Sequence, residues 1–128
     1  MNDVMRSFTR VRNAGLAKRF YELFLEADPR FKEMFRNTDF QKQTDLLTHG
    51  IMVLIQYSEG SASGEMAVRR IGELHKPGKV NVTPDMYPIW VDCLMKTLRE
   101  LDPEFTRELE TQWRLALRKG INTMIEMR

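Results

Sequence analysis

Apolar residues recur at intervals of three or four along almost the whole chain, and no useful stretch alternates apolar with polar residues. The first pattern is typical of amphipathic helices, and the second would indicate half-buried strands. Proline follows an aspartate or a threonine at three points, Asp28-Pro29, Thr83-Pro84 and Asp102-Pro103. Such a pair favours a helix start, because the polar side chain caps the helix and proline fits its first turn. The sequence therefore predicts an all-α fold.

These signals predict about seven helices of unequal length. Thr38 precedes Gln41 by three residues, a spacing typical of a capping box at the start of a long helix. The small residues of 58–64 indicate a loop, and 76–82 reads as a linker. Unequal helices without a heptad repeat argue against a regular four-helix bundle. The expected helices cover about 1–13, 16–27, 29–35, 38–57, 65–76, 83–101 and 102 to near the end.

Length and composition indicate one domain, 1–128, of a size that supports a single hydrophobic core. The formal net charge is only +2, and basic residues alternate with acidic ones, which argues against nucleic-acid binding. Because the start of the chain is polar we expect no secretory signal, and no apolar run reaches membrane-spanning length. Cys93 is the one cysteine, so we expect a small buried residue and no disulfide or cysteine-based metal cluster. We expect a cytoplasmic protein without a nucleic-acid or membrane partner.

Two histidines are the residues best suited to metal chemistry. The chain has no glycine-rich phosphate loop, no paired-histidine motif and no nucleophile–histidine arrangement. His75 ends a predicted helix just before a Pro-Gly break, where an axial metal ligand would be useful, although a lone histidine on an apolar face is more often structural. His49 follows Leu47 by two positions, roughly 200° around the helix, so we expect it to face away from the surface that Leu47 lines.

Tyr21 and Gln43 are polar residues on helix faces that are otherwise apolar. Gln43 lies one turn before Leu47 and shares its face. A buried phenol and a buried amide each need a hydrogen-bond partner. They either bond to each other, to backbone or to water, or they both point into a cavity and donate to a polar ligand.

The order and spacing of several residues resemble those of a bacterial single-domain globin. The likeness extends over nearly the whole chain, from about residue 7 to 127, and the likeness to the globin domain of flavohaemoglobins is more distant. It implies a globin-like fold without the helix called D, because the segment between Phe35 and Gln43 is short. The residues that carry the resemblance are Phe20, Tyr21, Asp28, Pro29, Phe35, Gln43, Leu47, His75, Pro84, Tyr87 and Trp113.

The resemblance implies roles for individual residues. His75 matches the proximal ligand of haem iron, and its second ring nitrogen then needs an acceptor, either the Ile71 carbonyl or a carboxylate of the last helix such as Glu126. No Cys-x-x-Cys-His motif is present, so the expected cofactor is non-covalent haem b. The long linker after His75 leaves open whether Val80 or Val82 packs under the haem. Haem contacts are expected from Phe35, Leu47, Val82 and Tyr87, and contacts with a distal gas ligand from Tyr21 and Gln43.

The implied function is reversible binding of dioxygen or another diatomic gas, for transport, storage or sensing. The alternative is enzymatic, either oxidation of nitric oxide by dioxygen or peroxidase-like chemistry, and it would need a separate reductase as partner. A third hypothesis is a haem-free signalling module, against which the presence of His75 argues. The oligomeric state stays open, with a homodimer as one possibility.

Overall fold

The structure is a computed structural model that describes residues 2–128, and within them it contains seven helices and no strand, as the sequence predicts. No helix lies between residues 35 and 39, which agrees with the expected absence of a D helix. None of the helices in the described range has the length and apolar character needed to cross a membrane. The first helix begins later and ends earlier than the predicted range 1–13, of which Met1 lies outside the described residues. The helices are α1 (Asp3–Val11), α2 (Leu16–Ala27), α3 (Pro29–Met34), α4 (Phe40–Ser58), α5 (Ala62–Leu74), α6 (Met86–Leu101) and α7 (Arg107–Glu126).

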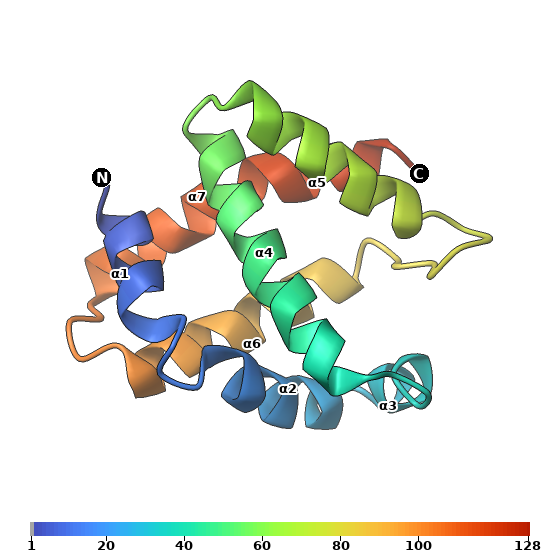
Figure 1. Ribbon diagram of the computed structural model, residues 1–128, viewed down its shortest axis with the longest axis horizontal. Helices are drawn as coiled ribbons and strands as arrows, with labels where there is room; N and C mark the ends of the chain where they lie inside the picture. Colours follow the sequence, from blue (N-terminus) through green and yellow to red (C-terminus); the bar gives the residue numbers. More distant parts are fainter. Residues whose placement is uncertain (1) are drawn as a thin grey trace.

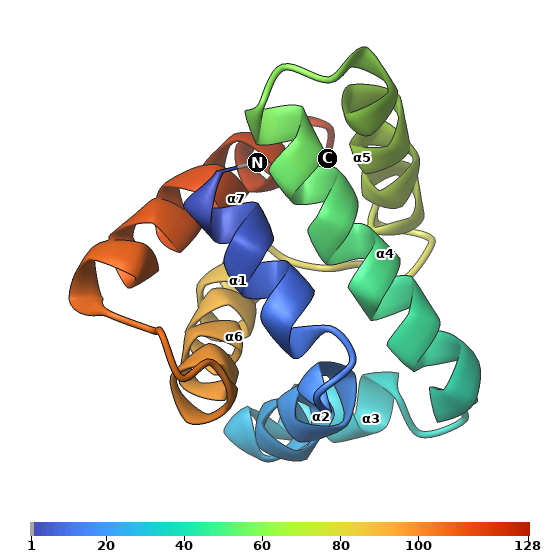
Figure 2. The ribbon, with the colours of Figure 1, turned by 60° about the vertical axis from the view of Figure 1, so that its left-hand side comes forward.

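The helices cross one another at wide angles instead of running side by side in a bundle, as Figure 1 and Figure 2 show. α4 packs against α5 and α7, α5 also packs against α7, and α2 packs against α6. The end of α5, the linker that follows it and α3 lie toward the same side of the molecule (Figure 1). This crossing arrangement brings the region around His75 and the region around α3 to one side.

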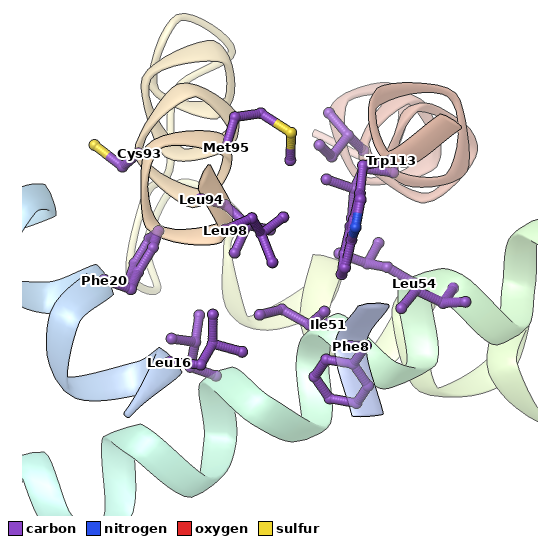
Figure 3. Close-up of a cluster of buried hydrophobic side chains, with 14 of the residues drawn as sticks. Phe8, Leu16, Phe20, Ile51, Leu54, Cys93, Leu94, Met95, Leu98 and Trp113 are labelled. Atoms are coloured by element: carbon purple, nitrogen blue, oxygen red, sulfur yellow. The ribbon is translucent and has the colours of Figure 1, made fainter. Parts of the chain in front are cut away.

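Buried apolar side chains from all seven helices of the described chain form one core, part of which Figure 3 shows. Trp113 of α7, Phe8 of α1 and Ile51 of α4 are all 0% exposed. Burying one such aliphatic or phenyl side chain contributes about 1.5–3 kcal/mol. Cys93 on α6 is buried as expected, and burial raises the pKa of its thiol.

α4 and α5 are capped by other residues than the sequence pattern predicts. Asp39, not Thr38, caps α4, because its carboxylate accepts the Gln41 backbone N–H at 3.0 Å. α5 begins at 62 rather than 65, because the Ser61 hydroxyl accepts the Gly64 backbone N–H at 3.0 Å. Three of the seven residues of the predicted loop, 62–64, therefore belong to α5.

α6 and α7 begin later in the sequence than the dipeptides Thr83-Pro84 and Asp102-Pro103 predict. Thr83 does not cap α6; its hydroxyl donates to the Asp85 carboxylate at 2.6 Å within a turn that precedes the helix. α7 is capped by Thr106, whose hydroxyl accepts the Leu109 backbone N–H at 3.0 Å. The predicted start at Asp102 is wrong, because that residue ends α6 and turns its side chain inward.

Asp102 ties α1 to the corner between α6 and α7. Its fully buried carboxylate accepts the Ser7 hydroxyl at 2.6 Å and the Arg10 guanidinium at 2.8 and 2.9 Å. The Trp113 indole N–H donates to the same Ser7 hydroxyl at 3.0 Å. Burial opposes ionisation of Asp102, but the hydrogen bonds from Arg10 and Ser7 outweigh it and hold its pKa below the ordinary value. This network fixes the end of the core that is formed by α1, α7 and the corner between α6 and α7.

Candidate functional site

His75 terminates α5, where the chain leaves the helix for the linker to α6 (Figure 1). Its backbone N–H donates to the Ile71 carbonyl at 3.1 Å, which fixes the end of the helix. The side chain is partly buried, and this burial lowers the pKa of His75 below its ordinary value. The ring is therefore neutral at physiological pH, and neutral imidazole is the form that coordinates a metal.

The His75 ring is held by Tyr87, the second residue of α6. Its Nδ1 lies 3.0 Å from the Tyr87 hydroxyl. Burial raises the pKa of Tyr87 to about 12, so the phenol is protonated. Neither acceptor considered from sequence holds the ring, because the side-chain hydrogen bond of His75 in the described structure goes to Tyr87, and Glu126 is exposed. Within residues 2–128 the other ring nitrogen, Nε2, has no hydrogen-bond partner.

The linker after His75 folds back onto the end of α5. The Val82 backbone N–H donates to the His75 carbonyl at 2.9 Å, and the Val80 N–H donates to the Leu74 carbonyl at 3.0 Å. Val82 is partly buried and packs against the core, whereas the Val80 side chain is 54% exposed. Of the two valines left open by the sequence, Val82 is the one that faces inward.

On α2 and α4, Tyr21 and Gln43 bond to each other. The Gln43 amide donates to the Tyr21 hydroxyl at 2.9 Å. Tyr21 is buried, and this raises its pKa to about 12 despite the opposing effect of the Gln43 bond. Because Gln43 supplies the hydrogen, the O–H of Tyr21 remains free to donate to a third group.

Aromatic side chains surround Tyr21. Its ring centroid lies 5.7 Å from that of Phe35 and 5.4 Å from that of Phe40. Leu47 follows Gln43 by one turn of α4 and is buried. Phe40 was not among the residues selected from the sequence, although its place three residues before Gln43, on the same helix face, was a signal for it.

The site residues thus form two groups. The first is Tyr21, Gln43, Phe35 and Leu47, and the second is His75, Tyr87 and Val82. Within the described part of the chain no hydrogen bond or ring–ring contact joins the two groups. Their helices α4 and α5 nevertheless pack together, and a Cβ added at Gly50 would lie 3.9 Å from the Ile71 side chain.

His49 belongs to neither group. It is exposed and lines a surface hollow of about 290 Å³ together with Arg12 and Asp45. This position agrees with the expectation that His49 faces away from Leu47. His75 is therefore the histidine whose surroundings suit a metal ligand: a neutral ring, one nitrogen engaged, and the other available.

Comparison with known proteins supports this reading of the fold. The globin family model matches residues 18–125. Over 121 residues the chain is 30% identical to a flavohemoprotein of Vibrio cholerae serotype O1, an alignment that covers 91% of this chain and 30% of the relative's length. The chain thus spans less than a third of that longer protein.

A solved structure shares the fold at comparable sequence identity. It is a Pseudomonas aeruginosa PAO1 protein described as structurally highly homologous to a human hemoglobin, with a TM-score of 0.90 and 30% identity. The match covers 96% of this chain and 93% of the other. The globin-like fold expected from the sequence is confirmed. Because the family model covers most of the sequence and the seven helices superpose on a hemoglobin-like protein, this chain belongs to the globin family.

Proposed function

We propose that residues 1–128 act as one globin domain that binds a single b-type haem through His75 and reversibly binds dioxygen or another diatomic gas. The observation that carries this proposal is the pairing of His75 with Tyr87 at 3.0 Å, which occupies Nδ1 and leaves Nε2 for the iron. Membership of the globin family supports it, because globins hold haem iron by a proximal histidine.

The residues of the second group fit the proximal side of such a haem. Nδ1 must carry the proton when Nε2 binds iron, so His75 donates to the Tyr87 oxygen and its tautomer is fixed. Val82, tied to the His75 carbonyl and packed on the core, would lie under the ring as an apolar contact. A neutral imidazole, a phenol and a valine are suitable neighbours for the apolar body of a porphyrin.

The residues of the first group fit the distal side. When bound, haem iron supplies an open coordination position for a diatomic gas. Leu47 and Phe35 exclude water from this side, and the free O–H of Tyr21 donates to a polar gas ligand. Gln43 orients that hydroxyl by donating to its oxygen. A hydrogen bond in such a dry environment is electrostatically strong.

Absorption spectra of the purified protein, before and after haem reconstitution, test the proposal. We expect a Soret band that is lost in His75→Ala and retained in His49→Ala. His49→Ala is the matched control, because it also removes a histidine, but an exposed one that belongs to neither group of site residues. No Soret band after reconstitution of the folded protein would overturn the proposal and leave the haem-free signalling module. Loss of the band in both variants would contradict the assignment to His75.

A second candidate function is oxidation of nitric oxide by dioxygen. The 30% identity to a flavohemoprotein favours it, and sustained turnover needs a reductase that supplies the electrons. Stopped-flow mixing of nitric oxide with the haem-loaded protein in dioxygen, with and without a flavin reductase, separates the two functions. Repeated turnover that depends on the reductase indicates an enzyme, and a single slow reaction indicates a carrier or sensor.

A further inference from the structure

Few side chains hold α5, the helix that ends at His75, to the rest of the fold. Of its thirteen residues only Gly64, Val68 and Gly72 are buried. Two of these three are glycines, which have no side chain of their own to pack into a neighbour. The position of the last turn of α5 therefore depends strongly on what lies against Gly72.

A thioether from the end of α7 fills the space beside Gly72. A Cβ added at Gly72 would lie 2.7 Å from the Met127 sulfur and 3.1 Å from the Met127 terminal methyl carbon. Since 2.7 Å is too close for a real Cβ, the sulfur occupies the place that a side chain at position 72 would take. The Cγ atom of Met124, one turn earlier on α7, would lie 3.3 Å from the same Cβ. We call this contact between α5 and α7 the Gly72 notch.

The Gly72 notch is connected to His75 through the backbone. The His75 N–H donates to the Ile71 carbonyl at 3.1 Å and to the Gly72 carbonyl at 3.2 Å. These two hydrogen bonds end the helix and set the direction in which the chain leaves it. A movement of Gly72 away from α7 therefore moves the backbone of His75 and, with it, the imidazole.

The Met127 sulfur lies where an oxidant can reach it and where an added oxygen has no room. The Met127 side chain is partly buried, whereas Met124 beside it is only 5% exposed. Oxidation to the sulfoxide turns a flexible apolar side chain into a polar, chiral one, and sulfoxide reductases reverse the change. The sulfur already touches Gly72, and a polar oxygen in an apolar contact is unfavourable unless it finds a hydrogen-bond donor. The sulfoxide therefore does not fit the Gly72 notch.

We propose that Met127 is an oxidation site whose sulfoxide releases the end of α5 from α7 and loosens the hold on His75. The oxidant is hydrogen peroxide. Its O–O bond breaks, one oxygen atom bonds to the Met127 sulfur, and the other leaves as water, so that the sulfur is oxidised and the peroxide is reduced. The effect on haem rests on the proposed function, whereas the modification and the release of α5 concern the protein alone.

Peptide mass spectrometry of the haem-free protein after graded exposure to hydrogen peroxide tests the site. Fragment ions locate the added oxygen on one methionine or another. We expect Met127 to be oxidised at least tenfold faster than the buried Met124, and more slowly than Met66, whose side chain is 58% exposed. Oxidation of Met127 at the rate of Met124 would overturn the site.

Amide hydrogen exchange of the same samples tests the release of α5. Peroxide should speed exchange of the Gly72 to His75 amides at least tenfold in the original protein. It should leave these amides unchanged in Met127→Leu, which keeps an apolar side chain of similar size without the sulfur. Met66→Leu is the matched control, since it removes an exposed methionine of α5, and it should respond to peroxide as the original does. Equal responses of the two variants would overturn the release.

Glutamine at position 127 gives the same test without an oxidant, because it places a polar group where the sulfoxide would be. Met127→Gln should exchange faster at the end of α5 and, after loading with haem, release it at least threefold faster than Met66→Gln. Unchanged exchange in Met127→Gln would overturn the release of α5. Faster exchange with unchanged haem release would overturn only the part that concerns haem, because α5 would then move without loosening an iron ligand.

Discussion

His75 and Tyr87 lie on either side of the linker between α5 and α6, and their side chains meet at 3.0 Å between Nδ1 and the phenol oxygen. One contact therefore sets both the tautomer of the histidine and the spacing between the end of one helix and the start of the next. Second-sphere partners of this kind commonly change metal affinity or activity by 10- to 100-fold. The pair is thus a direct target for mutation.

Replacing Tyr87 by phenylalanine keeps the apolar ring and removes the acceptor for Nδ1. We expect Tyr87→Phe to bind haem and to release it about 10- to 100-fold faster, because the His75 ring is no longer oriented. Transfer of haem to an excess of an acceptor globin measures this rate. Tyr57→Phe is the control. The Tyr57 hydroxyl pairs with that of Thr123 at 2.9 Å, and these two residues lie on α4 and α7, not at the end of α5 with His75. An unchanged release rate in Tyr87→Phe would contradict the role assigned to this hydroxyl.

The hydrogen bond from Gln43 to Tyr21 predicts unequal effects of mutating the two residues. Tyr21→Phe removes the donor to a distal gas ligand, and we expect the dioxygen dissociation rate to rise roughly tenfold or more, the effect of one strong hydrogen bond. Gln43→Leu should raise the rate less, because Gln43 acts by orienting Tyr21. Flash photolysis or stopped-flow kinetics measures both rates.

The double variant of Tyr21 and Gln43 provides the internal check. Because the amide acts through the phenol, Tyr21→Phe with Gln43→Leu should dissociate dioxygen about as fast as Tyr21→Phe alone. Additive effects would show that Gln43 contacts the ligand independently. A faster rate in Gln43→Leu than in Tyr21→Phe would reverse the assignment of donor and positioning residue.

Asp102 gives a prediction for acid stability. Its folded-state pKa lies below the unfolded value of about 3.9, so the unfolded chain binds more protons in this range and stability falls as the pH drops through the folded pKa. At pH 7 the full contribution is present, and Asp102→Asn, which leaves Arg10 and Ser7 with a neutral partner, should cost about 3 kcal/mol. Urea unfolding measures this difference.

The same measurement repeated at lower pH completes the test. The difference in the free energy of unfolding between the original protein and Asp102→Asn should narrow as the pH falls from about 5 toward 2, because the Asp102 carboxyl is then protonated and neutral, as the asparagine side chain is. Asp3→Asn is the control, since the Asp3 side chain is 63% exposed and its ion pair with Arg6 contributes little. A constant gap over the whole pH range would contradict the lowered pKa.

The fold was predictable from the sequence, but several contacts of the candidate-site residues were not. Helical periodicity is a local property, so the seven helices and the buried positions of Leu47 and Trp113 followed from it. A helix cap depends on which of several adjacent polar side chains reaches the first backbone N–H groups of the helix. For that reason α4 is capped by Asp39 and α5 by Ser61, and neither helix has the start that the sequence pattern predicts. Helical spacing also places Leu46 and Leu74 on apolar faces, but they are 61% and 59% exposed, because a helix face inferred from spacing is broader than the face that neighbouring helices cover.

Long-range pairs were the hardest to predict. Tyr87 was selected as a haem contact, yet its bond to His75 depends on how the linker folds, which spacing does not determine. The hydrogen bond from Arg128 to Asn81 joins residues far apart in sequence, and neither carries a local pattern that points to the other. Asp102 was assigned to a helix start because Asp-Pro is typical of one, whereas its true partners, Ser7 and Arg10, are at the opposite end of the chain.

Gly64 and Gly50 offer a test of how closely α4 and α5 pack. A Cβ added at Gly64 would lie 2.8 Å from the Tyr57 backbone nitrogen, and backbone cannot move aside as a side-chain tip can. Gly64→Ala should therefore destabilise the protein by about 1–3 kcal/mol, the usual cost of overpacking. A Cβ at Gly50 meets its nearest atom, in the Ile71 side chain, at 3.9 Å, an ordinary contact. Gly50→Ala should stabilise the protein by up to about 1 kcal/mol, because alanine favours a helix interior over glycine.

Urea unfolding of both glycine variants without haem, followed by circular dichroism, measures the two changes in the same protein. The two changes in the free energy of unfolding should have opposite signs, since both residues lie in helices and only the space around them differs. Equal stabilisation by Gly64→Ala and Gly50→Ala would mean that the corner between α4 and α5 is looser than the 2.8 Å approach to Tyr57 implies. In that case the orientation of α5, and with it the place of His75 relative to α4, would be less firmly fixed than the backbone contact at Gly64 indicates.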